Sequence, residues 1–215
     1  MYALAVNPLI HCGNYAAASM QSDELVKLAD EKGSPFWLAF GNMNRGSILA
    51  LTHKLSDGVQ MLTNAINAHR STGARNLLPW YLSSLSRAYL ELGQFDDACR
   101  SIGEAMTAVA TTKETWCEAE VNRVAGEIAL RQPDPDAAKA EAYFDRSLAV
   151  SHQQQAKSWE LRAAMSLARL WRDQGKVQQA RELLAPVYGW FTEGFDTRDL
   201  KEAKALLDVL EREVE

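Results

Sequence analysis

Apolar residues recur along most of this chain at steps of three and four positions, the spacing that places them on one face of an α-helix. In residues 79–113, an apolar stripe that includes Leu85 and Tyr89 stops at Gly93, and a second stripe that includes Ile102 follows. Glycine is favoured just after a helix because it adopts the left-handed backbone conformation at little cost. No segment shows the sustained alternation of a strand. The pattern predicts an all-α chain whose basic unit is a helical hairpin.

The hairpin pattern repeats along the chain. One register position holds a series of small or modest residues, namely Val6, Gly46, Ser86, Gly126 and Ala168. These positions are 40, 40, 40 and 42 residues apart. A fixed period in this range is typical of solenoids, in which a hairpin buries its apolar face only against its neighbours. We predict five hairpins over residues 1–194 and a C-terminal capping helix over residues 195–215, joined in a single continuous structural domain.

The small residues have a predicted physical role. Two antiparallel helices joined by a short turn pack closely only where side chains are small, so we expect the helices of a hairpin to cross at residues such as Gly46 and Gly58. Hairpin one is incomplete in this register, and Pro8 falls in the middle of its first helix, where it would kink or break the helix. We therefore expect the chain to be part of something longer.

The register resembles a known repeat. Small residues at its eighth and twentieth places and large residues at its eleventh and twenty-fourth resemble the tetratricopeptide repeat (TPR), as at Ala168, Trp171, Ala180 and Leu184. The period is longer than the usual 34 residues. The resemblance implies a right-handed superhelical solenoid of TPR-like hairpins, whose general use is to hold a protein or peptide partner.

Two C-terminal segments carry a more specific resemblance. Residues 155–171 and 183–204 resemble the C-terminal end of bacterial multidomain proteins that join an adenylate/guanylate cyclase or winged-helix domain to a predicted ATPase and a repeat tail. This implies a regulatory module from the C-terminal part of a bacterial, cytoplasmic signal-transduction protein. Its partner would be a protein, a peptide or another domain of the parent chain. None of the nucleotide-binding motifs of those proteins occurs here.

Composition limits the classes of partner and the cellular compartments that fit this chain. The chain has 215 residues, of which 47% are hydrophobic and 24% charged, with a net charge of −5, which argues against direct nucleic-acid binding. No apolar run approaches the roughly 20 residues that span a bilayer. Residues 1–22 carry no charge but lack the basic start of a signal peptide. Cys12, Cys99 and Cys117 have no metal-binding spacing, and we expect reduced thiols.

The sequence lacks the motifs of the common catalytic sites. It has no phosphate-binding loop and no nucleophile elbow, and its four histidines, His11, His53, His69 and His152, are isolated. Acidic pairs such as Asp134 and Asp136 fall at predicted helix starts, where capping explains them better than acid–base catalysis. We predict a non-enzymatic protein without a metal or cofactor.

A candidate ligand-binding wall follows from the first helix of each hairpin, which lines the concave side of TPR solenoids. The candidate residues are Phe40, Met43, Trp80, Arg87, Arg123, Arg162, Met165 and Arg169. Arginine forks suit carboxylates and phosphates, so the four arginines could hold an acidic peptide or phosphorylated ligand while the aromatic residues grip its apolar part. The competing interpretation is that the arginines pair within the protein, with acidic residues of neighbouring helices: Glu91, Glu120, Glu127 and Asp173.

The role of the tryptophans and the kind of ligand are both open at the level of the sequence. Trp37, Trp116 and Trp159 could form an aromatic ladder for a ligand or pack the entrance of each hairpin against the preceding helix. Besides a peptide-binding module, the fold could serve as a small-molecule effector sensor or a self-associating scaffold, for example a homodimer. An enclosed apolar pocket would favour the sensor, a long open groove a peptide, and a large hydrophobic symmetric contact the scaffold.

Overall fold

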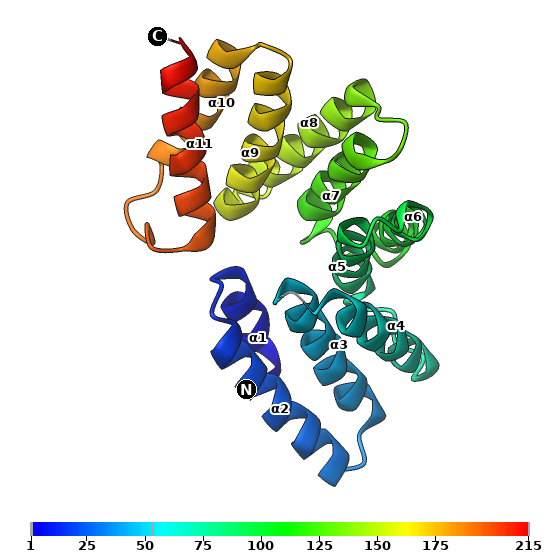
Figure 1. Cartoon of the computed structure of the whole chain (residues 1–215). Coiled ribbons are helices and arrows are strands. Elements are labelled where there is room, and N and C mark those ends of the chain that lie inside the picture. Colours follow the sequence, from blue (N-terminus) through cyan, green and yellow to red (C-terminus); the bar gives the residue numbers. More distant parts are fainter. Residues whose placement is uncertain (1, 53, 215) are drawn as a thin grey trace. The chain divides into compact units, whose positions relative to one another are not determined.

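The computed structural model describes residues 2–52 and 54–214, and all regular secondary structure within those ranges is helical (Figure 1). His53, one of the four isolated histidines, lies outside the described residues. The helices are α1 (Tyr2–His11), α2 (Tyr15–Glu31), α3 (Pro35–Leu51), α4 (Leu55–Ser71), α5 (Leu78–Glu91), α6 (Phe95–Thr112), α7 (Glu118–Arg131), α8 (Ala137–Gln153), α9 (Lys157–Asp173), α10 (Val177–Gly189) and α11 (Arg198–Val214).

Consecutive helices pack in pairs. The pairs α1–α2, α3–α4, α5–α6, α7–α8 and α9–α10 each form one hairpin, and α11 packs against both α9 and α10. The prediction of an all-α chain with five helical hairpins and a capping helix is therefore confirmed. The longer segment between α7 and α8 accounts for the single 42-residue step of the repeat.

Contacts between residues group the chain into two compact units, Met1–Glu114 and Thr115–Glu215. Unit 1 contains α1 to α6, and unit 2 contains α7 to α11. The single continuous domain expected from the sequence stays a prediction.

In the second and fourth hairpins, the two helices approach one another closely at the small residues. A Cβ atom added to Gly46 would lie 2.9 Å from the backbone nitrogen of Leu62, and one added to Gly58 would lie 2.6 Å from that of Ala50. In unit 2, a Cβ on Gly126 would overlap the ring of Phe144. These distances are shorter than van der Waals contact. The physical reason predicted for the small positions is therefore confirmed in both units.

Pro8 does not break the first helix, and the kink that the sequence offers as the other outcome stays a prediction. α1 continues through Pro8 to His11, and the carbonyl oxygen of Pro8 accepts a hydrogen bond from the Cys12 N–H at 2.9 Å. Proline has a φ compatible with an α-helix, and its ring is exposed here, so the helix loses one hydrogen bond without ending.

Predicted helix ends are confirmed in part. The Asp136 side chain accepts a hydrogen bond from the Lys139 N–H at 2.9 Å and caps α8. The final helix, expected within residues 195–215, is Arg198–Val214. The Thr197 carbonyl accepts a hydrogen bond from the Lys201 N–H, as at an N-cap, but its hydroxyl donates to the Gly194 carbonyl at 2.7 Å.

The connections between hairpins share one left-handed residue. The same register position is occupied by Gly73, Lys113 and Gln155, with φ of 82°, 62° and 54°. Side chains other than glycine are strained in this conformation by about 1–2 kcal/mol. From residue type alone, a left-handed conformation is predictable at this position only where the residue is glycine.

Lys113→Gly and Gln155→Gly are therefore expected to stabilise the protein. The relief of strain exceeds the extra backbone entropy that glycine loses on folding, which leaves a net gain of about 0.5–1 kcal/mol for each. Urea denaturation followed by circular dichroism measures the gain. Gly103→Ala makes the reverse substitution at a glycine of α6 with ordinary helical φ, where alanine is expected to be the more stable residue. Loss of stability in both glycine variants would contradict the prediction.

No helix in the described ranges combines the length and apolar character needed to cross a membrane.

Candidate functional site

The predicted wall residues of unit 1 form part of its core. Phe40, Met43 and Trp80 are 4%, 0% and 5% exposed. The ring of Phe40 lies 6.0 Å from that of Tyr81 between centroids, and Trp80 stands edge-on to His11 of α1 at 4.9 Å. The structure thus brings α1, α3 and α5 together over these side chains. They offer little surface to a ligand in this conformation, and their predicted binding role stays a prediction.

A buried polar pair lies in the same core. The Tyr81 hydroxyl donates to Asn44 Oδ1 at 2.5 Å, and both residues are fully buried. Burial raises the pKa of the Tyr81 hydroxyl, although a hydrogen bond with Asn7 acts to lower it. The phenol therefore stays protonated and links α3 to α5 as a donor. Arg87, the remaining candidate of this unit, lies partly buried on α5.

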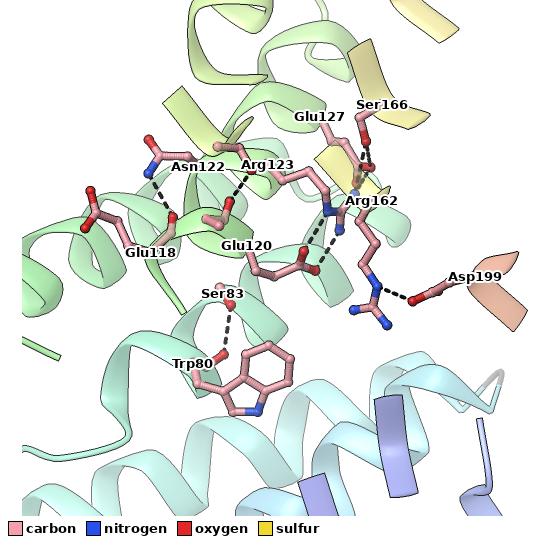
Figure 2. A network of polar contacts seen from close by, with 12 residues as sticks. Trp80, Ser83, Glu118, Glu120, Asn122, Arg123, Glu127, Arg162, Ser166 and Asp199 are labelled. Atoms are coloured by element: carbon pink, nitrogen blue, oxygen red, sulfur yellow. Dashed lines mark hydrogen bonds and ion pairs between the residues drawn. The ribbon is translucent and has the colours of Figure 1, made fainter. Parts of the chain in front are cut away.

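The arginine candidates of unit 2 are held by carboxylates. Figure 2 shows Arg123 of α7 between Glu120 and Glu127. Its Nε and Nη2 donate to the two oxygens of Glu120 at 2.7 Å each, and Nη1 pairs with Glu127 Oε1. Nη1 also lies 3.4 Å from Ser166 Oγ of α9. This network joins α7 to α9.

The network fixes the charge of Arg123. Burial acts to lower the pKa of its guanidinium, but the charges and hydrogen bonds of Glu120 and Glu127 outweigh burial and raise it. Arg123 is 8% exposed and Glu120 is 3% exposed. The group is thus a buried ion pair that positions α7 and α9, and its donors point to protein atoms.

Arg162 and Arg169 of α9 face α11. Arg162 Nε donates to Asp199 Oδ2 at 2.6 Å, and its guanidinium lies 5.1 Å from the ring centre of Trp159. Arg169 Nη2 lies 3.6 Å from Glu202 Oε2, and both side chains are about two-fifths exposed. Met165, on the same helix, is 3% exposed and packs in the core with the apolar face of α11.

Arg162 is held at one edge only. Figure 2 shows its two terminal nitrogens directed away from Asp199. Among the residues that the structure describes, neither Nη1 nor Nη2 has a hydrogen-bond partner. With Nε bonded to Asp199 and the Trp159 ring against one face of its plane, the guanidinium presents its outer edge for two parallel hydrogen bonds.

The partners of these arginines are in part those expected from the sequence. Glu120 and Glu127 pair with Arg123 from the same helix instead of a neighbouring one, and Asp173 pairs with Arg172. The sequence pattern did not predict Asp199 and Glu202 as partners of Arg162 and Arg169. The available signal was their position at the edge of the apolar stripe of α11.

The exposed tryptophans differ in environment. Trp37 is 43% exposed and stacks edge-on against Phe36 and Phe40 of its own helix. Trp116 is 39% exposed, and Trp159 lies against Arg162. The choice between a ligand ladder and hairpin packing stays open.

Unit 1 has an open surface groove that the sequence pattern did not predict. It lies between α4, α6 and the start of α5, with a volume of about 1090 Å³. Its lining includes Arg70, Arg75, Leu78, Leu82, Arg100 and Glu104. Arg70 bridges to Glu104 at 2.8 Å, so the groove links the second helices of two hairpins. The predicted wall used only the first helix of each hairpin, and it therefore did not include this surface.

No group of three or more histidine, cysteine or acidic side chains arranged to hold a metal occurs in residues 2–52 and 54–214.

No family model matches the chain, and no curated protein matches it in sequence. Solved structures show its fold. It is similar to the crystal structure of nearly identical TPR-like repeats from a Podosopora anserina protein assigned as a kinesin light chain, at 14% identity and a TM-score of 0.58. The match covers 98% of this chain and 95% of that one. A variant of those repeats matches at 16% identity and a TM-score of 0.54, over 87% and 92% of the two chains. The fold is that of TPR-like repeats.

Proposed function

We propose that this chain is a non-catalytic protein-interaction module whose unit 2 binds an acidic segment of a protein partner or of another domain of its parent. The TPR-like fold supports an interaction role, because stacked hairpins present extended surfaces. The C-terminal resemblance supports a place in a bacterial, cytoplasmic signalling protein with a cyclase or winged-helix domain. Binding would act on the parent by favouring one of its conformations.

The observation that carries the proposal is the environment of Arg162. Its guanidinium is oriented by Asp199 and Trp159, while Nη1 and Nη2 lack a partner among the described residues. A carboxylate can accept two parallel hydrogen bonds at that edge, a geometry that lysine cannot offer. Arg169 lies two turns further along α9 and adds positive charge for a second acidic group.

Arg162→Gln is expected to weaken binding of an acidic peptide by about tenfold or more, because charged hydrogen bonds contribute about 1.5–3 kcal/mol. The probe is fluorescein-labelled octaglutamate, with binding followed by fluorescence anisotropy at low salt. Arg181→Gln is the control, since Arg181 belongs to the same unit, is 42% exposed and lies 3.9 Å from Glu211. Equal binding by the Arg162 and Arg181 variants would argue against the proposed contact.

The proposed parent is tested separately. An antibody against this chain would detect the native polypeptide in lysate of the source cells. A band far above 23.9 kDa is expected for a module of a larger regulator. A band near that mass would contradict the multidomain parent and leave the peptide-binding proposal to its own test.

A further inference from the structure

The capping helix α11 brings its own carboxylates to the arginines of α9. Its apolar face, with Leu200, Ala203 and Leu207, is buried against residues of α9 and α10. Asp199 and Glu202 lie one turn apart beside this face. They reach Arg162 at 2.6 Å and Arg169 at 3.6 Å. The same helix therefore closes the core and supplies two acidic groups to the candidate site.

These contacts lower the charge that the site offers to a ligand. An acidic ligand at Arg162 meets the nearby charge of Asp199, and at Arg169 it meets that of Glu202. Like charges at such distances oppose binding, and each pair also neutralises one arginine. The negative charge of Glu202 is shared between two arginines, because Arg198 Nε also donates to its Oε1 at 2.7 Å.

We propose that α11 is a built-in competitor: Asp199 and Glu202 stand in for the acidic groups of the partner and limit its affinity. This rests on the proposed function of the Arg162 site. The helix does not have to leave its place, because the ligand binds the outer edge of Arg162 and the opposing charges belong to two side chains, of which Asp199 is 21% and Glu202 is 39% exposed. The apolar face of α11 remains buried in both states.

The double variant Asp199→Asn/Glu202→Gln tests the competitor. Each amide keeps an oxygen that can accept the arginine hydrogen bond, so orientation is retained while the negative charge is removed. Binding of labelled octaglutamate is expected to tighten by about fivefold or more, the lower end of common coupling between sites. Adding Arg162→Gln to the double variant is expected to remove most of this gain.

A charge-matched control separates local competition from net charge. Glu211→Gln/Glu213→Gln removes two negative charges from the other end of α11, where Glu211 lies 3.9 Å from Arg181. This control is expected to bind octaglutamate with wild-type affinity. Far-UV circular dichroism of both double variants confirms that helix content is unchanged.

The outcomes distinguish the two proposals. If wild type binds and Asp199→Asn/Glu202→Gln binds equally or more weakly, the competitor is overturned while the binding site stands. Equal tightening in both double variants would also overturn it, since net charge alone would then explain the gain. If neither wild type nor Asp199→Asn/Glu202→Gln binds octaglutamate, the proposed acidic-ligand function fails, and the competitor fails with it.

Discussion

Glu120→Ala is expected to destabilise the protein by about 3–5 kcal/mol, because it leaves the Arg123 guanidinium buried without the carboxylate that accepts two of its hydrogen bonds. Both oxygens of Glu120 lie 2.7 Å from Arg123 nitrogens, and both side chains are buried. Glu127 stays in contact but is more exposed, with 26% of its side chain accessible, so it compensates only in part. Urea denaturation followed by circular dichroism measures the loss.

Glu118→Ala is the matched control on the same helix. Glu118 pairs with Arg146 at 2.7 Å, but 58% of the Arg146 side chain is exposed. Exposed ion pairs contribute about 0–1 kcal/mol, so this variant should lose no more than that. Similar losses in the two variants would mean that burial of the Glu120–Arg123 pair does not determine its energetic role.

The architecture was largely predictable because it depends on local spacing. Apolar residues at helical steps define each helix, and the recurrence of Gly46 and Gly126 in one register marks where the helices of a hairpin cross. A glycine at such a crossing is needed for steric reasons, so its position in a single sequence indicates where two helices pack closely. Pro8 does not end its helix, since one lost hydrogen bond at an exposed position does not outweigh the remaining helix.

The candidate site was predictable only in outline. A repeat register states which helix face a residue occupies, and it placed Phe40, Met43 and Trp80 on one wall. It does not state how deeply neighbouring helices cover that face, and these side chains are buried. The contacts of Arg162 and Arg169 depend on how α11 is docked along α9. That alignment is set by tertiary packing of apolar side chains, which no local spacing encodes.

The left-handed connections show the same limit. Gly73 is readable as a helix stop from its residue type, whereas Lys113 and Gln155 occupy the equivalent position with ordinary side chains. Their conformation is imposed by the hairpins that they join. The left-handed conformation of Lys113 and Gln155 can be predicted from their equivalence to Gly73 in the repeat, but not from their residue types.

Gly58→Ala is expected to destabilise unit 1 by about 2 kcal/mol. The new Cβ would lie 2.6 Å from the Ala50 nitrogen and 2.9 Å from its Cα, so two backbones must separate. Overpacking of this kind costs about 1–3 kcal/mol and sometimes more. The higher helix propensity of alanine returns about 1 kcal/mol, which the clash is expected to exceed at this short distance from rigid backbone atoms.

Gly103→Ala provides the comparison within the same unit. Gly103 is exposed on α6, and an added Cβ would meet no atom within 4 Å. The same substitution is therefore expected to stabilise the protein by about 0.5–1 kcal/mol through helix propensity alone. Thermal denaturation should show opposite shifts, with a decrease of about 4–8 °C for Gly58→Ala. A gain in both variants would mean that α3 and α4 can separate at little cost, and close packing at the small positions would then not be what fixes the hairpin.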